Sequence, residues 1–152
     1  MVVDGCSTRH GRLVVNKQRN VDELKNDLIA DEGIRLKPYL CPAGKTTIGV
    51  GRNLDDVGIT EAEAMTLLDD DIARVTAQLA KALPWLQGNN VQRAVGNMTF
   101  QMGLGGVLKF KKMLAALQVK DYTTARREAL NSAWARQTPQ RAKRVTDLMK
   151  DD

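Results

Sequence analysis

The side chains best suited to chemistry lie close together, between positions 32 and 47. Glu32 is a carboxylic acid directly before a glycine, and Cys41 and Thr47 follow it. A carboxyl group held near a sugar can protonate a leaving-group oxygen, which is the step that glycoside cleavage requires. Each residue also has an ordinary structural interpretation: a solvated acid at a helix end, a small buried thiol and a strand threonine.

Glu32 is expected at the end of a helix. Apolar residues recur on one helical face from about Val21 to Asp31, at positions 21, 24, 28 and 29. Gly33 follows, and glycine commonly ends a helix because it adopts positive φ without penalty. The negative end of the helix dipole disfavours an ionised carboxylate there, which suits a group that has to donate a proton.

Cys41 and Thr47 are expected in a small antiparallel sheet. Prolines and glycines between residues 34 and 54 exclude a helix, and Thr46–Val50 is short and rich in β-branched residues. Pro42–Lys45 has the composition of a turn. The sequence therefore predicts a hairpin or three-stranded sheet directly after Glu32.

A long helix is predicted from Thr60 to about Leu83. Thr60 and Glu63 have the spacing of a capping box, and apolar residues continue at helical spacing up to Pro84, which ends or kinks a helix. Roughly twenty-three residues span about 35 Å, enough to connect two lobes. Four further helices are predicted, over Val91–Met102, Val107–Leu117, Asp121–Trp134 and Thr138–Met149.

These elements predict an α+β fold with two lobes. Residues 1–20 show no periodicity and are expected to form an irregular tail, followed by one folded domain over residues 21–152. In that domain we expect a small β-containing lobe over about 33–58, a linking helix over 60–83, and a helical lobe over about 84–150 that also includes the first helix. A crevice between two such lobes is the natural place for a site.

The composition excludes several classes of protein. The chain has 152 residues, of which 43% are hydrophobic and 27% charged, and it has two cysteines; this excludes collagen, coiled-coil and disulfide scaffolds. No apolar run approaches the roughly 20 residues of a membrane span. The net charge of +5 favours anionic partners, although the low aromatic content argues against a base-stacking nucleic-acid binder. No metal ion and no organic cofactor is expected.

Three blocks of sequence stand in a recognisable order. They are Glu32–Tyr39 with Thr47–Gly51, then Arg93–Gly103, then Trp134 with Gln137–Val145. The first block resembles the signature of the phage T4-type lysozymes, which form glycoside hydrolase family 24. The second resembles the central core helix of that family, and the third resembles its C-terminal lobe. The resemblance covers about residues 21–149 and implies a lysozyme-like fold.

The resemblance implies that Glu32 is the general acid and that Cys41 and Thr47 complete the catalytic set. The family usually has an aspartate at the position of Cys41, and some members are similar to this chain in having a cysteine. An ionised Cys41 would supply negative charge beside an oxocarbenium-like centre or attack it, whereas a neutral thiol would only position water. Thr47 would hold the attacking water. Lys45 is the nearest residue in sequence that could favour the thiolate.

Two supporting pairs also follow from the resemblance. Arg141 is expected to pair with Glu32 across the cleft. Arg52 stands where the family more usually has a histidine, and it is expected to pair with Asp71. The alternative for both pairs is a weak, exposed ion pair worth about 0–1 kcal/mol.

Substrate-binding residues are implied on the helical lobe. The expected cleft floor consists of Phe100, Gln101, Trp134 and Gln137. Aromatic faces cover the apolar faces of sugars, so Phe100 is the best candidate for that contact, and core packing is an equal interpretation of Trp134. At two positions where the family contacts substrate, this chain has Met113 and Glu128, and both depart in residue type.

The activity implied is that of a peptidoglycan-cleaving N-acetylmuramidase, acting on the β-1,4 bond between N-acetylmuramic acid and N-acetylglucosamine. A lytic transglycosylase, a non-catalytic wall-binding domain and a nucleic-acid-binding helical module are the alternatives. The expected partner is bacterial peptidoglycan, met by a monomer without stable membrane insertion. The expected location is the host cytoplasm before holin-dependent release to the periplasm and cell wall, or the virion.

Overall fold

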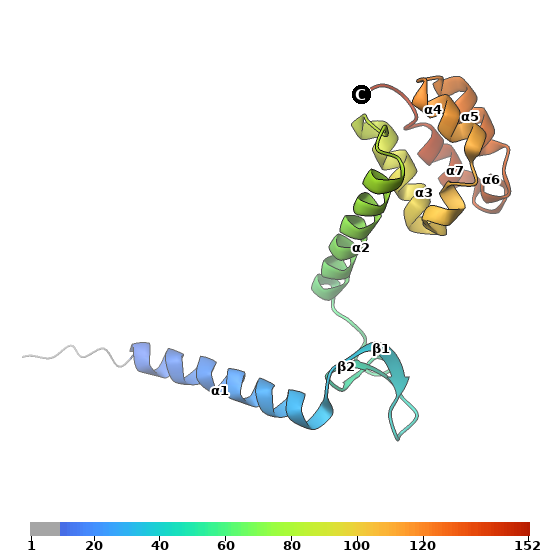
Figure 1. Ribbon diagram of the computed structural model, residues 1–152. Helices are drawn as coiled ribbons and strands as arrows, with labels where there is room; N and C mark the ends of the chain where they lie inside the picture. Colours follow the sequence, from blue (N-terminus) through green and yellow to red (C-terminus); the bar gives the residue numbers. More distant parts are fainter. Residues whose placement is uncertain (1–9) are drawn as a thin grey trace, which may run out of the picture. The chain divides into compact units, whose positions relative to one another are not determined.

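The computed structural model describes residues 10–152, with side chains described from residue 18 onward. The chain divides into two compact units, the first ending at Thr60 and the second spanning Glu61–Asp152. The described part of the first unit contains a helix and a small sheet, and the second unit is helical (Figure 1). This combination of many helices with one antiparallel sheet confirms the predicted α+β class.

The first helix, α1 (His10–Glu32), is longer than the sequence indicated. The prediction of an irregular tail over residues 1–20 is wrong for residues 10–20, which are helical, and residues 1–9 lie outside the described part. Pairs one turn apart stabilise this extension. Gln18 Nε2 donates to Asp22 Oδ1 at 3.2 Å, and Arg19 pairs with Glu23 at 3.0 Å.

The C-terminal end of α1 lies where the sequence predicts it. The helix ends at Glu32, and Gly33 follows with φ of 70°. The Gly33 N–H donates to the Ile29 carbonyl at 2.9 Å, so the glycine closes the last turn. Along the helix, the apolar side chains of Val21, Leu24 and Leu28 are each about half exposed.

The sheet of the first unit is antiparallel, with order β1-β2-β3. Its strands are β1 (Arg35–Leu40), β2 (Thr46–Gly49) and β3 (Arg52–Asn53). Thr47 occupies the centre of the register, opposite Tyr39 on β1 and Asn53 on β3. The predicted turn over Pro42–Lys45 is confirmed, because the Cys41 N–H donates to the Lys45 carbonyl at 3.0 Å. The hairpin thereby places Cys41, directly after β1, near Thr47, the second residue of β2.

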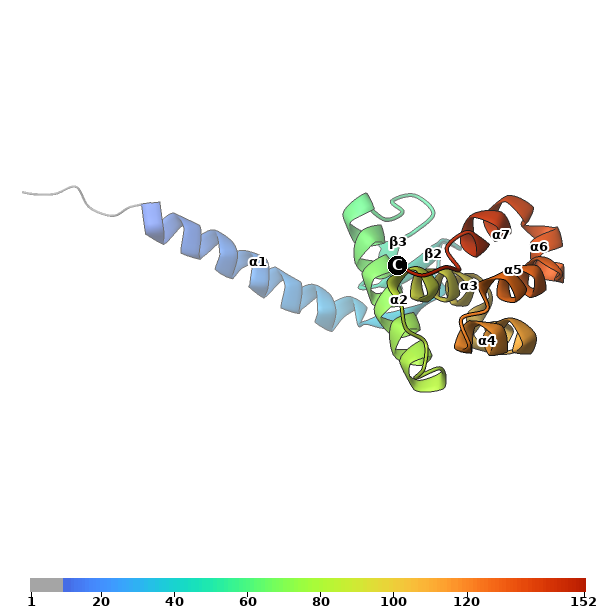
Figure 2. The ribbon, with the colours of Figure 1, turned by 90° about the horizontal axis from the view of Figure 1, so that it is seen from above.

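The second unit begins with α2 (Glu61–Ala82), directly after Thr60 and with the bounds that the capping box predicts. The remaining helices are α3 (Asn89–Val107), α4 (Lys111–Gln118), α5 (Tyr122–Leu130), α6 (Ala133–Gln137) and α7 (Pro139–Thr146). Figure 2 shows α3 between α2 and the group formed by α4–α7, and α3 packs against both α2 and α7. The first residue of α7 is Pro139, as predicted.

Several of the predicted helices have different bounds in the structure, one of them because of local capping. The segment Asp121–Trp134 is two helices, since Ser132 has an extended backbone and its Oγ accepts from the Ala135 N–H at 3.1 Å. Serine is a favoured N-cap, so it starts α6 and ends the continuity of α5. Helix α3 kinks at Gly103, which has a non-helical φ of 75° and directly follows the predicted end at Met102, and a short helical stretch then continues to Val107. The helix predicted from Val107 begins at Lys111.

The core of the second unit lies around α3. Ala94, Val95 and Met98 on this helix are fully buried, and Val107, Met113 and Met149 are fully buried around them. Trp134 on α6 is 8% exposed and closes one end of this core. Within residues 10–152 no helix is both long enough and apolar enough to cross a membrane.

We expect Val95→Ala to lower the free energy of unfolding by about 2 kcal/mol, because it removes two buried methyl groups and leaves a cavity in α3's core face. The matched control is Val119→Ala, since Val119 is 73% exposed. This second change is expected to alter the same free energy by less than about 0.5 kcal/mol. Urea unfolding followed by circular dichroism measures both, and equal effects would contradict the assigned core.

Candidate active site

Glu32 contacts the sheet through the turn between β2 and β3. A Cβ atom at position 51 would lie 3.2 Å from Glu32 Oε2, closer than ordinary contact allows. Gly51 itself has φ of 69°, a conformation that other residues rarely adopt. Glycine at this position therefore permits both the turn and the close approach of the carboxyl group. The side chain of Glu32 is exposed, so its oxygens are open to a ligand.

Cys41 is a half-buried free thiol at the end of β1. Hydrogen bonding to the backbone of Lys45 lowers the pKa of this thiol from its ordinary value, and the backbone of Ala43 and the side chain of Thr47 act in the same direction. Burial opposes them and is outweighed. Lys45 thus favours the thiolate as the sequence suggested, but through its backbone, because its ammonium group bonds to Asp56 Oδ1 at 2.9 Å.

Thr47 is nearly fully buried, with 3% of its surface exposed. Its Oγ1 donates to the Lys45 carbonyl at 3.0 Å, and its side chain also contributes to the lowered pKa of Cys41. The structure therefore brings two of the three predicted catalytic residues close together. It places the third, Glu32, in the same unit, against the turn that follows β2.

A polar loop after β3 holds this hairpin, and the sequence analysis missed it. Asp55 Oδ2 accepts from the Thr46 N–H at 2.8 Å. Asp56 Oδ2 accepts from Asn53 Nδ2 at 2.8 Å, and the Asp56 N–H donates back to Asn53 Oδ1 at 3.1 Å. The available signal was the Asn-x-x-Asp spacing, since both residue types bond their own backbone in turns. These bonds fix the strand that carries Thr47.

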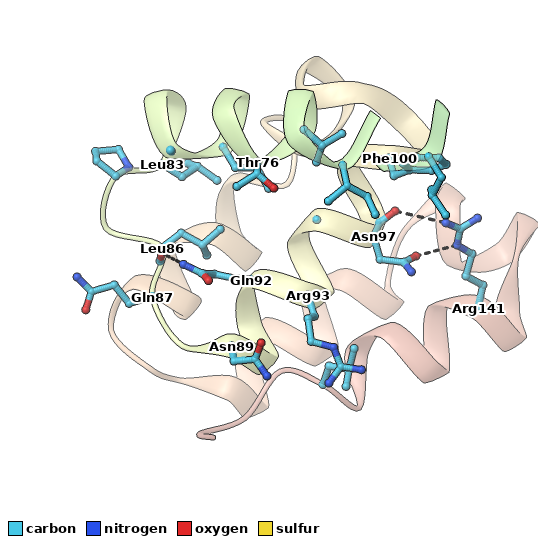
Figure 3. Close-up of a pocket in the computed structure, with 18 residues that line it drawn as sticks. Thr76, Leu83, Leu86, Gln87, Asn89, Gln92, Arg93, Asn97, Phe100 and Arg141 are labelled. Atoms are coloured by element: carbon cyan, nitrogen blue, oxygen red, sulfur yellow. Dashed lines mark hydrogen bonds between the residues drawn. The ribbon is translucent and has the colours of Figure 1, made fainter. Parts of the chain in front are cut away.

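In the second unit, Arg141 lines a cavity of about 930 Å³ between α2 and α3 (Figure 3). Its Nε donates to Asn97 Oδ1 at 2.9 Å, and a second guanidinium nitrogen donates to the Asn97 carbonyl at 3.4 Å. Phe100 lies on the same cavity and is 48% exposed, so it can present its ring to a ligand. Asn97 was not singled out from the sequence, and it orients the guanidinium group.

Gln101 and Trp134 lie in contact with each other. Trp134 Nε1 donates to Gln101 Oε1 at 2.8 Å, and the indole ring meets Phe110 edge-on, with centroids 6.2 Å apart. Because Trp134 is buried, its structural role is to fill the core and orient the exposed amide of Gln101. Gln137, at the end of α6, is exposed.

The predicted partners Arg52 and Asp71 belong to different units. Arg52 donates to the Gly58 carbonyl at 3.2 Å. The carboxylate of Asp71 bonds to the guanidinium of Arg74, one turn further along α2. The pairs Arg52–Asp71 and Glu32–Arg141 would both join the two units, and they stay predictions.

An acid at a helix end against a small sheet, combined with a helical unit, defines a lysozyme-like class of glycoside hydrolase. Comparison with known proteins supports this class. The family model described as phage lysozyme matches residues 30–150. A probable T4-type lysozyme of Dictyostelium discoideum is 30% identical over 159 residues, which cover 84% of this chain and 94% of the relative. The chain therefore belongs to the phage lysozyme family.

This chain matches a different share of each of two phage relatives. An endolysin of Acyrthosiphon pisum secondary endosymbiont phage 1 is 37% identical over 101 residues, or 64% of this chain and 68% of that protein. The pre-baseplate central spike protein of Enterobacteria phage T4 is 36% identical over 149 residues, or 78% of this chain. The chain spans only 26% of the spike protein's length, whereas it spans nearly all of the Dictyostelium relative.

The lowered pKa of Cys41 can be tested by alkylation. In a Cys6→Ser background, the rate of reaction with iodoacetamide is expected to reach half its maximum below about pH 8.5, the pKa of an unperturbed thiol, because only the thiolate reacts. The same protein unfolded in urea is the control and should titrate at the ordinary value. Identical midpoints in the folded and unfolded protein would show that the hairpin does not stabilise the thiolate.

Proposed function

We propose that this protein is an N-acetylmuramidase that hydrolyses the β-1,4 bond between N-acetylmuramic acid and N-acetylglucosamine in peptidoglycan. The observation that carries the proposal is the position of Glu32, whose exposed carboxyl lies against Gly51 in the same unit as Cys41 and Thr47. Membership of the phage lysozyme family supports the same reaction class. No step of the reaction requires a metal ion or organic cofactor.

In the proposed reaction, Glu32 gives its proton to the glycosidic oxygen as the bond from that oxygen to the anomeric carbon breaks. Water then adds to the anomeric carbon and releases one proton, and the Glu32 carboxylate takes up a proton again, which restores the acid. The transition state carries positive charge on the sugar ring, so a nearby anion stabilises it. The hydrogen bonds that lower the pKa of Cys41 favour the anionic form of this thiol, which can act as that stabilising charge.

Thr47 is proposed to act on water. Its hydroxyl donates to the Lys45 carbonyl or to an ionised Cys41, and in either arrangement its oxygen has a lone pair left to accept a hydrogen bond. A water molecule that donates to Thr47 Oγ1 is oriented with its own lone pair free for attack. The buried side chain of Thr47 and the rigid loop after β3 would hold that orientation.

We propose that the second unit binds the glycan and supplies a charged partner for Glu32. Phe100 offers an exposed ring, and Gln101 offers an amide oriented by Trp134. Arg141 is proposed to pair with Glu32 when the units are assembled, since Asn97 already orients its guanidinium. A charged partner of this kind would hold the carboxyl group in place during the reaction.

The biological setting is proposed from the phage relatives. One of them is named an endolysin and another a pre-baseplate central spike protein. The first name supports action at lysis, after holin-dependent release from the host cytoplasm to the cell wall. The second supports a place in the virion. In either setting we propose a monomer that acts on peptidoglycan, without a nucleic-acid partner.

A lytic transglycosylase is the second candidate, because cysteine replaces the carboxylate that the family usually has at position 41. Such an enzyme begins with the same proton transfer, but the 6-hydroxyl group of the muramic acid attacks in place of water. The product is then an anhydro-muropeptide that is lighter by one water molecule. Mass analysis of the soluble products separates the two reactions.

We expect Glu32→Gln to lower the rate of wall digestion by about 10²- to 10⁴-fold, because glutamine cannot donate the proton. Asp31→Asn is the control, since it removes an exposed acid at the neighbouring position of the same helix. Turbidity of purified bacterial cell walls measures the rate, and circular dichroism checks the fold. Full digestion by Glu32→Gln would exclude the proposed mechanism, and inactivity of the native protein would favour a wall-binding domain.

A further inference from the structure

One peptide group of the first unit, the bond between Lys45 and Thr46, is held from both sides. Its carbonyl oxygen, on Lys45, accepts from the Cys41 N–H at 3.0 Å and from Thr47 Oγ1 at 3.0 Å. Its N–H, on Thr46, donates to Asp55 Oδ2 at 2.8 Å. A trans peptide group is planar and nearly rigid, so a partner that fixes the N–H also fixes the direction of the carbonyl. Asp55 therefore acts on the same group that Cys41 and Thr47 contact.

Asp55 takes the place of a strand residue in this contact. Strand β3 pairs with β2 in antiparallel register, and one step beyond it the Leu54 N–H donates to the Thr46 carbonyl at 2.7 Å. In a regular antiparallel ladder, two residues paired in this way exchange both of their hydrogen bonds. Here the Thr46 N–H bonds to the Asp55 side chain instead of the Leu54 carbonyl. A carboxylate is the stronger acceptor of the two, because it is ionised.

The neighbouring aspartates of this loop have separate contacts. Asp56 bonds to the ammonium group of Lys45 at 2.9 Å and to the amide of Asn53 at 2.8 Å, so it holds two side chains. Asp55 holds the backbone of the hairpin through the Thr46 N–H. Both aspartates are exposed. Of the two, Asp55 is the one whose removal would free the peptide group.

Two features of the candidate site depend on the direction of the Lys45 carbonyl. Its bond with the Cys41 N–H closes the turn after β1, and this turn brings the Cys41 thiol within reach of the Lys45 backbone, the main cause of the lowered pKa of that thiol. Its bond with Thr47 Oγ1 gives the buried threonine hydroxyl a fixed partner. If the peptide group rotates, both features are lost together.

We propose that Asp55 is a positioning residue for the proposed hydrolysis, because its carboxylate fixes the peptide group that orients Cys41 and Thr47. It acts through this peptide group and exchanges no proton with the sugar. The role requires a hydrogen-bond acceptor rather than a negative charge, so an amide oxygen at position 55 can replace the carboxylate. The inference rests on the proposed function, since it names a further residue of the same site.

Alkylation of Cys41 tests the inference without any substrate. In the Cys6→Ser background, we expect Asp55→Ala to move the pH midpoint of the reaction with iodoacetamide upward, toward that of the urea-unfolded protein, because the turn loosens. Asp55→Asn removes the same charge but keeps an oxygen that can accept from the Thr46 N–H. This second variant should therefore keep the midpoint of the parent protein.

Digestion of purified cell walls tests the consequence for the reaction. We expect Asp55→Ala to lower the maximal rate about tenfold, the scale of one hydrogen bond to a charged group, and Asp55→Asn to recover most of it. The wall concentration that gives half the maximal rate should stay the same, since the contact is with the hairpin rather than the glycan. Asp69→Ala is the matched control, because it removes an exposed carboxylate from α2. Circular dichroism verifies that all three variants are folded.

An unchanged alkylation midpoint in Asp55→Ala would overturn the inference, whatever the rate of digestion. Equal effects of the alanine and asparagine variants would also overturn it, since they would indicate a charge effect. The same holds if Asp55→Ala digests walls at the rate of an active native protein. Because alkylation needs no glycan, a shifted midpoint in a protein that does not digest walls would refute only the proposed reaction.

Discussion

The close approach of the Glu32 carboxyl to Gly51 is the constraint on which the proposed chemistry of the first unit depends. It joins the end of α1 to the turn after β2, and a side chain at position 51 would crowd the carboxyl group. The hairpin on the other side of that turn carries Cys41 and Thr47. The acid and the groups that would handle charge and water are therefore fixed to one small sheet, which Asp55 and Asp56 stabilise through hydrogen bonds.

In the proposed reaction, a thiol in place of the family's usual carboxylate changes how the site would obtain its negative charge. An unperturbed carboxyl group is ionised at neutral pH, whereas an unperturbed thiol is mostly neutral. The turn after β1 compensates for this difference, because the backbone of Lys45 and the side chain of Thr47 lower the pKa of Cys41. Backbone hydrogen bonds are fixed by the fold, so this effect does not depend on the position of a flexible ammonium group.

Much of this fold could be predicted from local sequence signals. The bounds of α2, the Pro42–Lys45 turn and the start of α7 each follow from a cap, a turn or a proline that acts on its immediate neighbours. The division between α5 and α6 was missed, because Ser132 was not recognised as an N-cap within an apolar periodic pattern. The early start of α1 was missed because its residues show no apolar periodicity, and the two polar pairs at positions 18–23 were not considered.

In the candidate site too, residues close together in the sequence could be predicted, whereas contacts between distant residues could not. Glu32, Cys41 and Thr47 stand close in sequence, so a family motif could nominate all three. Asn97 was not found, since its contact with Arg141 joins residues 44 positions apart and neither residue type alone indicates it. Trp134 could be assigned to the core only when its indole was seen to be buried and bonded to Gln101.

The location of the acid on a helix with a half-exposed apolar stripe has a mechanical consequence. Glu32 is the last residue of α1, and a helix transmits displacement along its axis with little bending over a few turns. Any partner that holds Val21, Leu24 and Leu28 therefore also fixes the base of the candidate catalytic side chain.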